Sequence, residues 1–391
     1  MAHQRTMTIV LAVSVALGAA GCGSKSSTPT TSATDSTATP TTEATQTTEP
    51  AGVSESGISA ERCQANKDAG TITYLTGFDF AAAASIVEVV VAQNKGYFDK
   101  MCLKVDLKPS FSTANYPLVA GNKAQFSSSG SFTELAEFSA ANGASLVGMS
   151  VDGRTAIDVL IGKADKVTKY EDLKGTTIGV KGKLPSSIKA LLASHSLVEG
   201  TDYKTVLIDG FDPKVHVALP SIVAFPGWKS NEPGQLQAAG IKFNTFDPTA
   251  EQIPGSFGLI YTNKEFLAAH PTAAQDFMRA VMFGLADALA DPDGAAQICV
   301  DAITAGGNPN FLSPDGEKFR WQTESALIKS LTPQGTPFGM PDVAGLQAEI
   351  DAYAKAGVFT EGGTPSTDGL VDPSVLAGIY NADGKVIWPR A

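Results

Sequence analysis

Hydrophobic and polar positions follow two alternating periods through residues 71–391. Short apolar runs ended by glycine or polar residues are typical of strands, and apolar stripes at every third or fourth residue are typical of helices facing a core. Because strand and helix alternate, we expect mostly parallel sheets with helices on both faces, an α/β fold. The expected strands are Thr71–Thr76, Leu103–Leu107, Gln125–Ser129, Ser145–Met149, Thr177–Val180, Leu219–Phe225 and Leu259–Thr262. The expected helices are Ala81–Asn94, Phe132–Asn142, Ser187–Leu197, Ala295–Ile303, Val343–Ala356 and a long helix from Pro271 with Phe277, Val281, Leu285 and Ala288 on one face.

The first apolar run, Met7–Leu17, differs from the later ones because it follows Arg5 and leads through small residues into Cys22. This order is typical of an export signal, and the run is shorter than the ~20 residues of a membrane-spanning helix. A cysteine directly after Ala-Gly resembles the lipobox of bacterial lipoproteins, whose thiol is diacylated and becomes the mature N-terminus. We therefore expect a signal peptide over residues 1–22 that ends at the lipid-modified Cys22. An ordinary signal peptide cut at another position is the alternative.

Residues 23–60 are expected to be a disordered Ser/Thr/Pro-rich tether. Between Gly23 and Pro50 there is no Val, Ile, Leu, Phe, Tyr or Trp, and more than half of the residues are Ser or Thr. Such a segment cannot bury enough apolar surface to offset its ordering entropy. It suits a flexible connection between a lipid anchor and a folded body.

The charge of the chain restricts its partners. The formal net charge is −11, which disfavours nucleic acid and anionic membrane surfaces, since both require a basic surface. About 330 residues follow the tether, enough for one large domain or two joined lobes. We expect an exported body, lipid-anchored on the extracytoplasmic face of the cell membrane.

Three cysteines lie beyond the anchor, in an exported context that permits disulfides. Their spacing shows no C-x-x-C motif and no Cys/His ligand pattern, so no metal site is predicted. Cys63 lies just before the first expected strand and Cys102 just before the second. Because neighbouring parallel strands start close together, we expect a Cys63–Cys102 disulfide, with Cys299 as a small buried hydrophobic residue.

Four segments resemble, in the same order, one family of solute-binding proteins. They are Asn94–Phe98 with Lys104–Leu107, Ala120–Phe126, Glu171–Val180 (EDLKGTTIGV) and Gly227–Pro233 (GWKSNEP). The family comprises periplasmic binding proteins of ABC importers for thiamine pyrimidine precursors, nitrate, sulfonates and taurine. The third segment is the sharpest match, to a D-L-K-G-K-x-I-G-V pattern, whereas Gln125 stands where the family usually has Asp.

The resemblance implies a two-lobed periplasmic-binding-protein fold (type II-like), each lobe a mostly parallel sheet flanked by helices, with the ligand in the cleft between them. Residues 71–154 and 257–391 would form lobe 1 with the C-terminal helices, and residues 155–256 lobe 2. The hinges would lie near Asp152–Thr155 and Pro254–Gly258. The implied partners are a small-molecule ligand and the permease and ATPase subunits of an ABC importer, and we expect a monomer.

Ligands bind open α/β sheets outside the carboxyl ends of the strands, so the loops there form the candidate site. Two aromatics bracket an Asp after the first strand, two serines precede a helix start, and a Trp lies among Gly and Pro in a polar loop. Aromatic faces suit a flat ring, and N–H groups at a helix start attract polar acceptors. The candidate ligand-binding residues are Phe78, Asp79, Phe80, Ser129, Ser131, Lys183, Ser186, Trp228, Asn231 and Glu232.

Each candidate also has a purely structural alternative. Phe78 suits a core, Ser131 suits a helix cap, and Glu232 suits the surface. Arginine is scarce: Arg154 is the only one between Arg62 and Arg279. Sulfonate and nitrate sites usually require a guanidinium fork or several converging donors. We therefore expect a flat, weakly charged heterocycle: a thiamine pyrimidine precursor first, riboflavin second, and a sulfonate, taurine or nitrate third.

An enzyme is the rival class, since some relatives of this fold make the pyrimidine itself. Those enzymes resemble this chain in strand order but depend on clustered cysteines and an active-site histidine. Here the four cysteines are dispersed, and His195, His216 and His270 lack a G-x-S-x-G or H-E-x-x-H context. We expect a binding protein with no catalytic residue, metal or cofactor. A sensor that signals to a partner without transport stays open as a third class.

Overall fold

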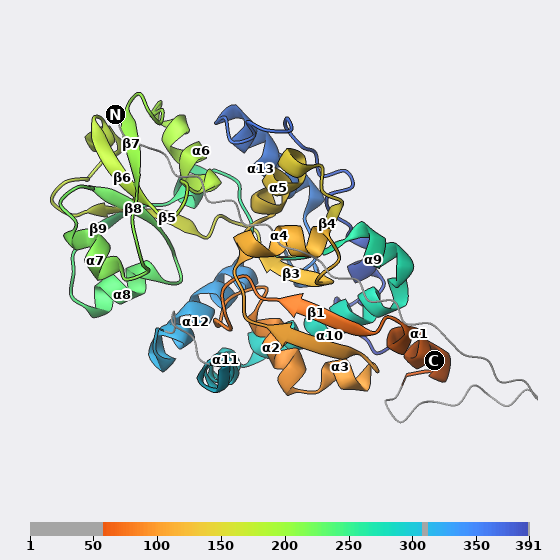
Figure 1. The fold of residues 1–391 in the computed structure, drawn as a ribbon. Coiled ribbons are helices and arrows are strands. Elements are labelled where there is room, and N and C mark those ends of the chain that lie inside the picture. The colour runs from red at the N-terminus through yellow and green to blue at the C-terminus, as the bar shows by residue number, and fades with distance from the viewer. Residues whose placement is uncertain (1–57, 307–311, 390–391) are drawn as a thin grey trace, which may run out of the picture. The chain divides into compact units, whose positions relative to one another are not determined.

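Two five-stranded sheets organise the computed structural model, which describes residues 58–306 and 312–389 (Figure 1). The described residues belong to one unit, Glu49–Ala391. The expected signal peptide with Cys22, and residues 23–57 of the expected tether, lie outside the described residues. The first described element, α1 (Ala60–Asp68), is capped by Ser59 and begins at the last residue of the range assigned to the tether.

The first sheet has the strand order β2-β1-β3-β10-β4. Strands β1, β2, β3 and β4 run in one direction, and β10 runs antiparallel between β3 and β4. We call this sheet with the elements packed on it lobe 1. Its strands are β1 (Thr71–Leu75), β2 (Lys104–Lys108), β3 (Phe126–Ser129), β4 (Leu146–Gly153) and β10 (Phe257–Asn263).

The second sheet has the order β7-β6-β8-β5-β9, and here β5 is the antiparallel strand, between β8 and β9. We call this sheet with its helices lobe 2. Its strands are β5 (Asp158–Lys163), β6 (Thr176–Val180), β7 (Tyr203–Leu207), β8 (Ala224–Trp228) and β9 (Phe243–Phe246). Its helical elements are η1 (Tyr170–Leu173), α6 (Ser186–Ser194), α7 (Pro213–Ala218) and α8 (Glu232–Ala238).

The chain passes between the sheets twice, once from β4 to β5 and once from β9 through η2 (Pro248–Glu251) to β10. The two passages lie against each other where they meet lobe 1. A Cβ on Gly153 would lie 1.8 Å from the ring of Phe257, so only glycine fits at that point. These are the segments in which the sequence predicted the hinges.

Most of the remaining helices pack on lobe 1. They are α2 (Val87–Asn94), α3 (Tyr97–Lys100), α4 (Ser112–Ala120), α5 (Phe132–Asn142), α9 (Lys264–Ala269), α10 (Pro271–Ala290), α11 (Pro292–Gly306), α12 (Pro314–Leu331), α13 (Val343–Lys355) and α14 (Ser374–Ala377). Helix α13 also contacts α6 of lobe 2.

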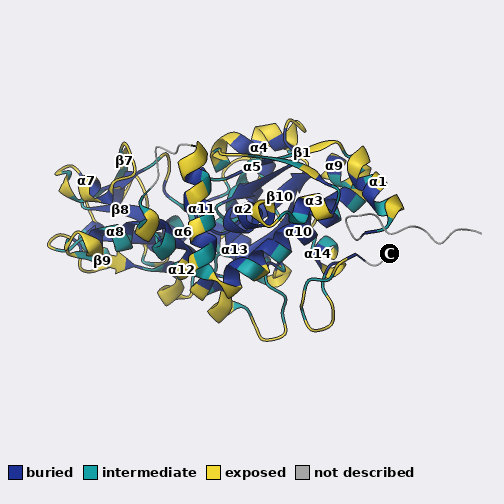
Figure 2. Cartoon of the chain, turned by 90° about the horizontal axis from the view of Figure 1, so that it is seen from below, coloured by how far each residue is buried: buried dark blue, intermediate teal, exposed yellow. Residues whose placement is uncertain are grey.

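Helices α2 and α10 form the centre of the larger core (Figure 2). The stripe predicted for the long helix is confirmed, since Phe277, Val281 and Leu285 are all buried there. The helices approach so closely that a Cβ on Gly284 would meet the carbonyl oxygen of Glu88 at 2.0 Å. Helix α2 is apolar nearly all round because it packs against both α10 and α11.

The helix expected over Ala81–Asn94 is wrong in its first half, because α2 begins only at Val87. Residues 81–86 form a loop whose N–H groups donate to carboxylates. Ala84 N donates to Glu324, and Ser85 N donates to Asp152. Ser85 also has a left-handed φ of 63°. These tertiary hydrogen bonds override the helix propensity of four consecutive alanines.

The strand expected over Leu219–Phe225 is displaced, since β8 spans Ala224–Trp228 and includes Pro226. Proline is tolerated here because β6 pairs with β8 only at Ala224. Strands β5, β7 and β9 were not predicted. Strands β7 and β9 are the two edge strands of the second sheet, where burial is incomplete and the alternating hydrophobic pattern is weak.

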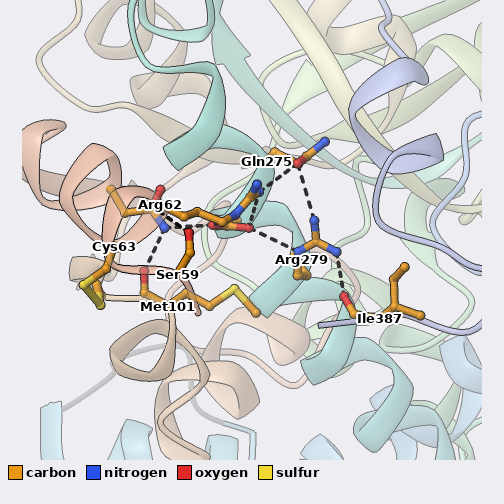
Figure 3. A network of polar contacts seen from close by, with 10 residues as sticks. Ser59, Arg62, Cys63, Met101, Gln275, Arg279 and Ile387 are labelled. Carbon is orange, nitrogen blue, oxygen red and sulfur yellow. Dashed lines mark hydrogen bonds and ion pairs between the residues drawn. A yellow bond between two sulfur atoms is a disulfide. The ribbon is translucent and has the colours of Figure 1, made fainter. Parts of the chain in front are cut away.

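Helix α1 is fastened to lobe 1 by a disulfide and by hydrogen bonds of Arg62 and Asn66 (Figure 3). Cys63 and Cys102, the pair that the sequence suggested, are joined by a disulfide, and Cys299 is a buried thiol. The Arg62 guanidinium donates to both carboxylate oxygens of Asp276 in α10 at 2.7 Å. The Asn66 amide donates to the same carboxylate at 2.8 Å.

Candidate functional site

A cavity of about 310 Å³ lies between loops of the two lobes. Its walls come from the segments after β1, β2 and β3 in lobe 1 and after β6, β7 and β8 in lobe 2. The first residues of β5 and β10 also line it, and α12 contributes two charged residues. All six loops follow the carboxyl ends of strands, which is where open α/β sheets bind ligands. The volume lies at the lower end of the range for small-molecule sites.

Five aromatic side chains line this cavity: Phe78, Phe111 and Phe257 from lobe 1, and Phe211 and Trp228 from lobe 2. The rings of Phe78 and Phe111 in lobe 1 meet edge to face at 5.6 Å between centroids. Phe211 of lobe 2 reaches across to Phe78 at 5.5 Å. Trp228, at the end of β8, is partly buried against the core of lobe 1. The cavity therefore presents ring faces and edges on which a flat ligand can stack.

Glu232 is held in place at the start of α8. Its carboxylate accepts from the N–H of Trp228 at 2.8 Å and from Lys181 Nζ at 2.9 Å. The side chain is only 4% exposed. Because both oxygens already have protein donors, Glu232 orients the loop that carries Trp228.

Two further carboxylates face the cavity from opposite lobes. Glu134 lies in the first turn of α5, and Asp158 is the first residue of β5. Burial raises the pKa of Glu134 to about 7, and the charge of Asp158 adds to that rise. Burial also raises the pKa of Asp158 to about 6. Both residues line the cavity.

Helix α12 joins the lobes through Glu324. This carboxylate accepts from Ala84 N in lobe 1 and from Ser230 Oγ in lobe 2, both at 2.6 Å. Burial raises its pKa to about 7. One turn earlier, Arg320 donates to Glu317 at 2.6 Å, and its guanidinium lies 5.9 Å from the Phe78 ring centroid. The arginine is thus committed to a buried partner.

Of the ten residues proposed from the sequence, six line the cavity: Phe78, Ser129, Lys183, Trp228, Asn231 and Glu232. The other four, Asp79, Phe80, Ser131 and Ser186, lie outside this lining. Ser131 caps α5 by accepting from Glu134 N at 3.4 Å, and Ser186 donates to Glu137 at 3.4 Å. Arg154 also points elsewhere, since it pairs with Asp342 and donates to the Met340 carbonyl.

Several lining residues were missed by the sequence reasoning: Phe111, Phe211, Glu134, Asp158, Lys181, Arg320 and Glu324. Phe211 had a usable signal, because it lies between Gly210 and Asp212-Pro213, a setting like that of Trp228. Arg320 and Glu324 of α12 had no such sequence signal, since nothing in the local sequence indicates that this helix returns to the cavity.

The described residues contain no helix long and apolar enough to cross a membrane. Among the same residues, no group of three or more His, Cys, Asp or Glu side chains is placed to hold a metal ion.

Residues 83–295 match the family model described as NMT1/THI5 like. The riboflavin-binding protein RibY of Chloroflexus aurantiacus is 30% identical over 139 residues, which cover 35% of this chain and 39% of the relative. The match therefore spans well under half of the relative's length.

Two solved structures share the fold over nearly their whole length. A protein from Bordetella bronchiseptica RB50 has a TM-score of 0.60 at 18% identity, covering 79% of this chain and 96% of that chain. The periplasmic aliphatic sulphonate binding protein SsuA from Escherichia coli has a TM-score of 0.57 at 12% identity, covering 78% and 92%. This likeness confirms the two-lobed α/β fold expected from the sequence.

Proposed function

We propose that this chain, which belongs to the NMT1/THI5-like family, is the solute-binding component of an ABC importer and captures a flat heterocycle between its lobes. The observation that carries the proposal is the cavity lined by aromatic side chains from both lobes. Because only two passages of chain connect the sheets, the lobes can close over a ligand by a hinge.

The ligand that we propose is a flavin, with riboflavin first and a thiamine pyrimidine precursor second. Two observations support reversing the order expected from the sequence. The relative with 30% identity is named for riboflavin binding. Five aromatic residues line the cavity, including Phe111, Phe211 and Phe257, which the sequence reasoning had not placed there. A tricyclic ring uses that aromatic surface more fully than a single pyrimidine ring does.

A sulfonate, taurine or nitrate is the alternative ligand class, and the arginines argue against it. Arg320 lines the cavity but is bonded to the buried Glu317, and Arg154 is paired with Asp342. Arg154 lies outside the cavity lining, and the charge of Arg320 is already balanced by a buried carboxylate. The lining also includes four carboxylates, which would repel one.

The delivery step rests on the proposed anchor. We propose that Cys22 carries the lipid that holds the protein on the extracytoplasmic face of the cell membrane, beside its permease and ATPase subunits. A Cys22→Ala variant should then move from the membrane fraction to the soluble exported fraction. Unchanged membrane partitioning of that variant contradicts the anchor.

Ligand binding is tested by thermal unfolding with riboflavin, hydroxymethyl- and formylamino-pyrimidines, thiamine, taurine, alkanesulfonates and nitrate. A ligand at a hundredfold excess over its Kd stabilises the protein by about 2.7 kcal/mol. We expect the Trp228→Ala variant to lose most of the shift. Trp388→Ala is the matched control, because Trp388 is 41% exposed and packs on Phe283, outside the cavity lining. A shift given only by a sulfonate overturns the flavin proposal.

Prolonged incubation with the same ligands separates binding from catalysis. A binding protein returns its ligand unchanged after prolonged incubation, whereas an enzyme of pyrimidine synthesis would change it. Recovery of altered ligand, by chromatography and mass spectrometry, would establish the enzyme class instead.

A further inference from the structure

The two carboxylates that face the cavity from opposite lobes each have an oxygen that accepts no hydrogen bond from another described residue. Glu134 Oε2 accepts from the Tyr116 hydroxyl at 3.1 Å, and Asp158 Oδ2 accepts from Ser187 Oγ at 2.6 Å. Among the hydrogen bonds of the described residues, none reaches Glu134 Oε1 or Asp158 Oδ1. Both side chains line the cavity, so those oxygens are available to a ligand.

The lysines of this region are engaged elsewhere. Lys181 Nζ bonds Glu232 at 2.9 Å, and Lys183 Nζ bonds Glu137 at 2.5 Å. Neither donates a hydrogen bond to the acidic pair. Burial dominates the pKa of both carboxylates, and the charges of Lys183 and Lys229 offset it only in part, at Glu134 and Asp158 respectively. Burial of two mutually repelling carboxylates is unfavourable unless donors reach them. A bound ligand that brings O–H or N–H groups can supply those donors.

Hydroxyl groups suit this environment better than an ammonium group. Lys181, Lys183 and Arg320 also line the cavity, so it presents hydrogen-bond donors beside the acidic acceptors. A hydroxyl can donate to a carboxylate and can also accept from a nearby lysine. The acidic pair therefore favours a neutral, hydroxylated chain.

We propose that Glu134 and Asp158 form a subsite for the hydroxylated side chain of the ligand, reaching it from the two lobes at once. This inference rests on the proposed function, in which the flat ring occupies the aromatic part of the cavity. Asp158 lies opposite Trp228 in the β5–β8 register, so the subsite borders the platform for the ring. In a flavin, the chain is the ribityl group attached to the tricyclic ring.

The test compares riboflavin with lumiflavin, which has the same ring but a methyl group in place of the ribityl chain. Their Kd values are measured with the complete exported protein by quenching of flavin fluorescence. We expect riboflavin to bind at least about tenfold more tightly, because hydrogen bonds to charged groups account for roughly a tenfold to hundredfold change in affinity. This comparison uses the unaltered protein and does not depend on how a variant folds.

Substitution then assigns the difference to the pair. Glu134→Gln and Asp158→Asn should weaken riboflavin about tenfold or more and change lumiflavin less than about threefold. Glu171→Gln and Asp165→Asn are the matched controls, because both residues are exposed on lobe 2, and they should change neither ligand.

The outcomes are distinguishable. Equal affinity of the unaltered protein for riboflavin and lumiflavin overturns the subsite while leaving the flavin-binding function intact. The subsite is also overturned if Glu134→Gln and Asp158→Asn weaken riboflavin binding no more than the control substitutions do. Binding of neither flavin overturns the proposed ligand, and the subsite with it.

Discussion

The Asp276→Asn substitution should cost this protein about 3 kcal/mol of unfolding free energy. Asp276 is fully buried in α10 and accepts from Arg62, Asn66 and Arg279. Arg279 is only 3% exposed, so removal of the carboxylate charge leaves a buried guanidinium without its ionic partner. Breaking a buried pair in this way costs about 3–5 kcal/mol. We take the lower end because Arg279 keeps its bond to the Ile387 carbonyl.

The assay is equilibrium unfolding in urea, with the loss read from the transition midpoint. In a protein of this size, a loss of 1 kcal/mol lowers the Tm by roughly 2 °C. The Tm of Asp276→Asn should therefore be about 6 °C lower than that of the unaltered protein. Asp287→Asn is the matched control on the same helix, where a half-buried carboxylate accepts only from the Tyr97 hydroxyl at 2.6 Å. It should cost about 1 kcal/mol. A loss for Asp276→Asn no larger than that of the control would refute the reasoning.

Three further predictions concern stability and the cysteines. Burial raises the pKa of Glu324 and Glu349 to about 7, above the ~4.3 of an unfolded chain. The folded state therefore binds more protons than the unfolded state. The stability that Glu324 and Glu349 contribute is full below pH ~4 and is lost as the pH rises through about 7. In Glu349→Gln the urea midpoint should fall less steeply over this pH range. Gly153→Ala should lower the urea midpoint, because its Cβ would overlap the Phe257 ring at 1.8 Å; an unchanged midpoint contradicts the close contact. A thiol reagent should label Cys299 only after unfolding, because it is fully buried; rapid labelling of the folded protein contradicts this.

The sequence predicted elements best where one local pattern dominated. The stripe of Phe277, Val281 and Leu285 specifies the buried face of α10, and Ser131 specifies the start of α5. The loop over residues 81–86 could not be predicted in this way. Its backbone is held by Glu324 and other carboxylates far away in the sequence, and helix propensity carries no information about them.

The aromatic loop residues of the candidate site could be predicted from the sequence, but its facing carboxylates could not. Trp228 stood out as an aromatic residue in a polar loop, and Phe211 has the same setting. Glu134 resembles an ordinary first-turn acid of a capped helix, and Asp158 opens a strand that the pattern did not reveal. Their facing positions depend on how the two lobes meet, which no local pattern encodes.

The attachment of α1 determines how a mechanical load on the N-terminus would spread. The disulfide to Cys102, just before β2, and the Arg62–Asp276 pair lead from α1 into the sheet and central helix of lobe 1. Lobe 2 has no covalent connection to α1 except through the two passages between the sheets. With the anchor proposed at Cys22, we expect lobe 1 to stay fixed relative to the membrane and lobe 2 to move in the proposed closure.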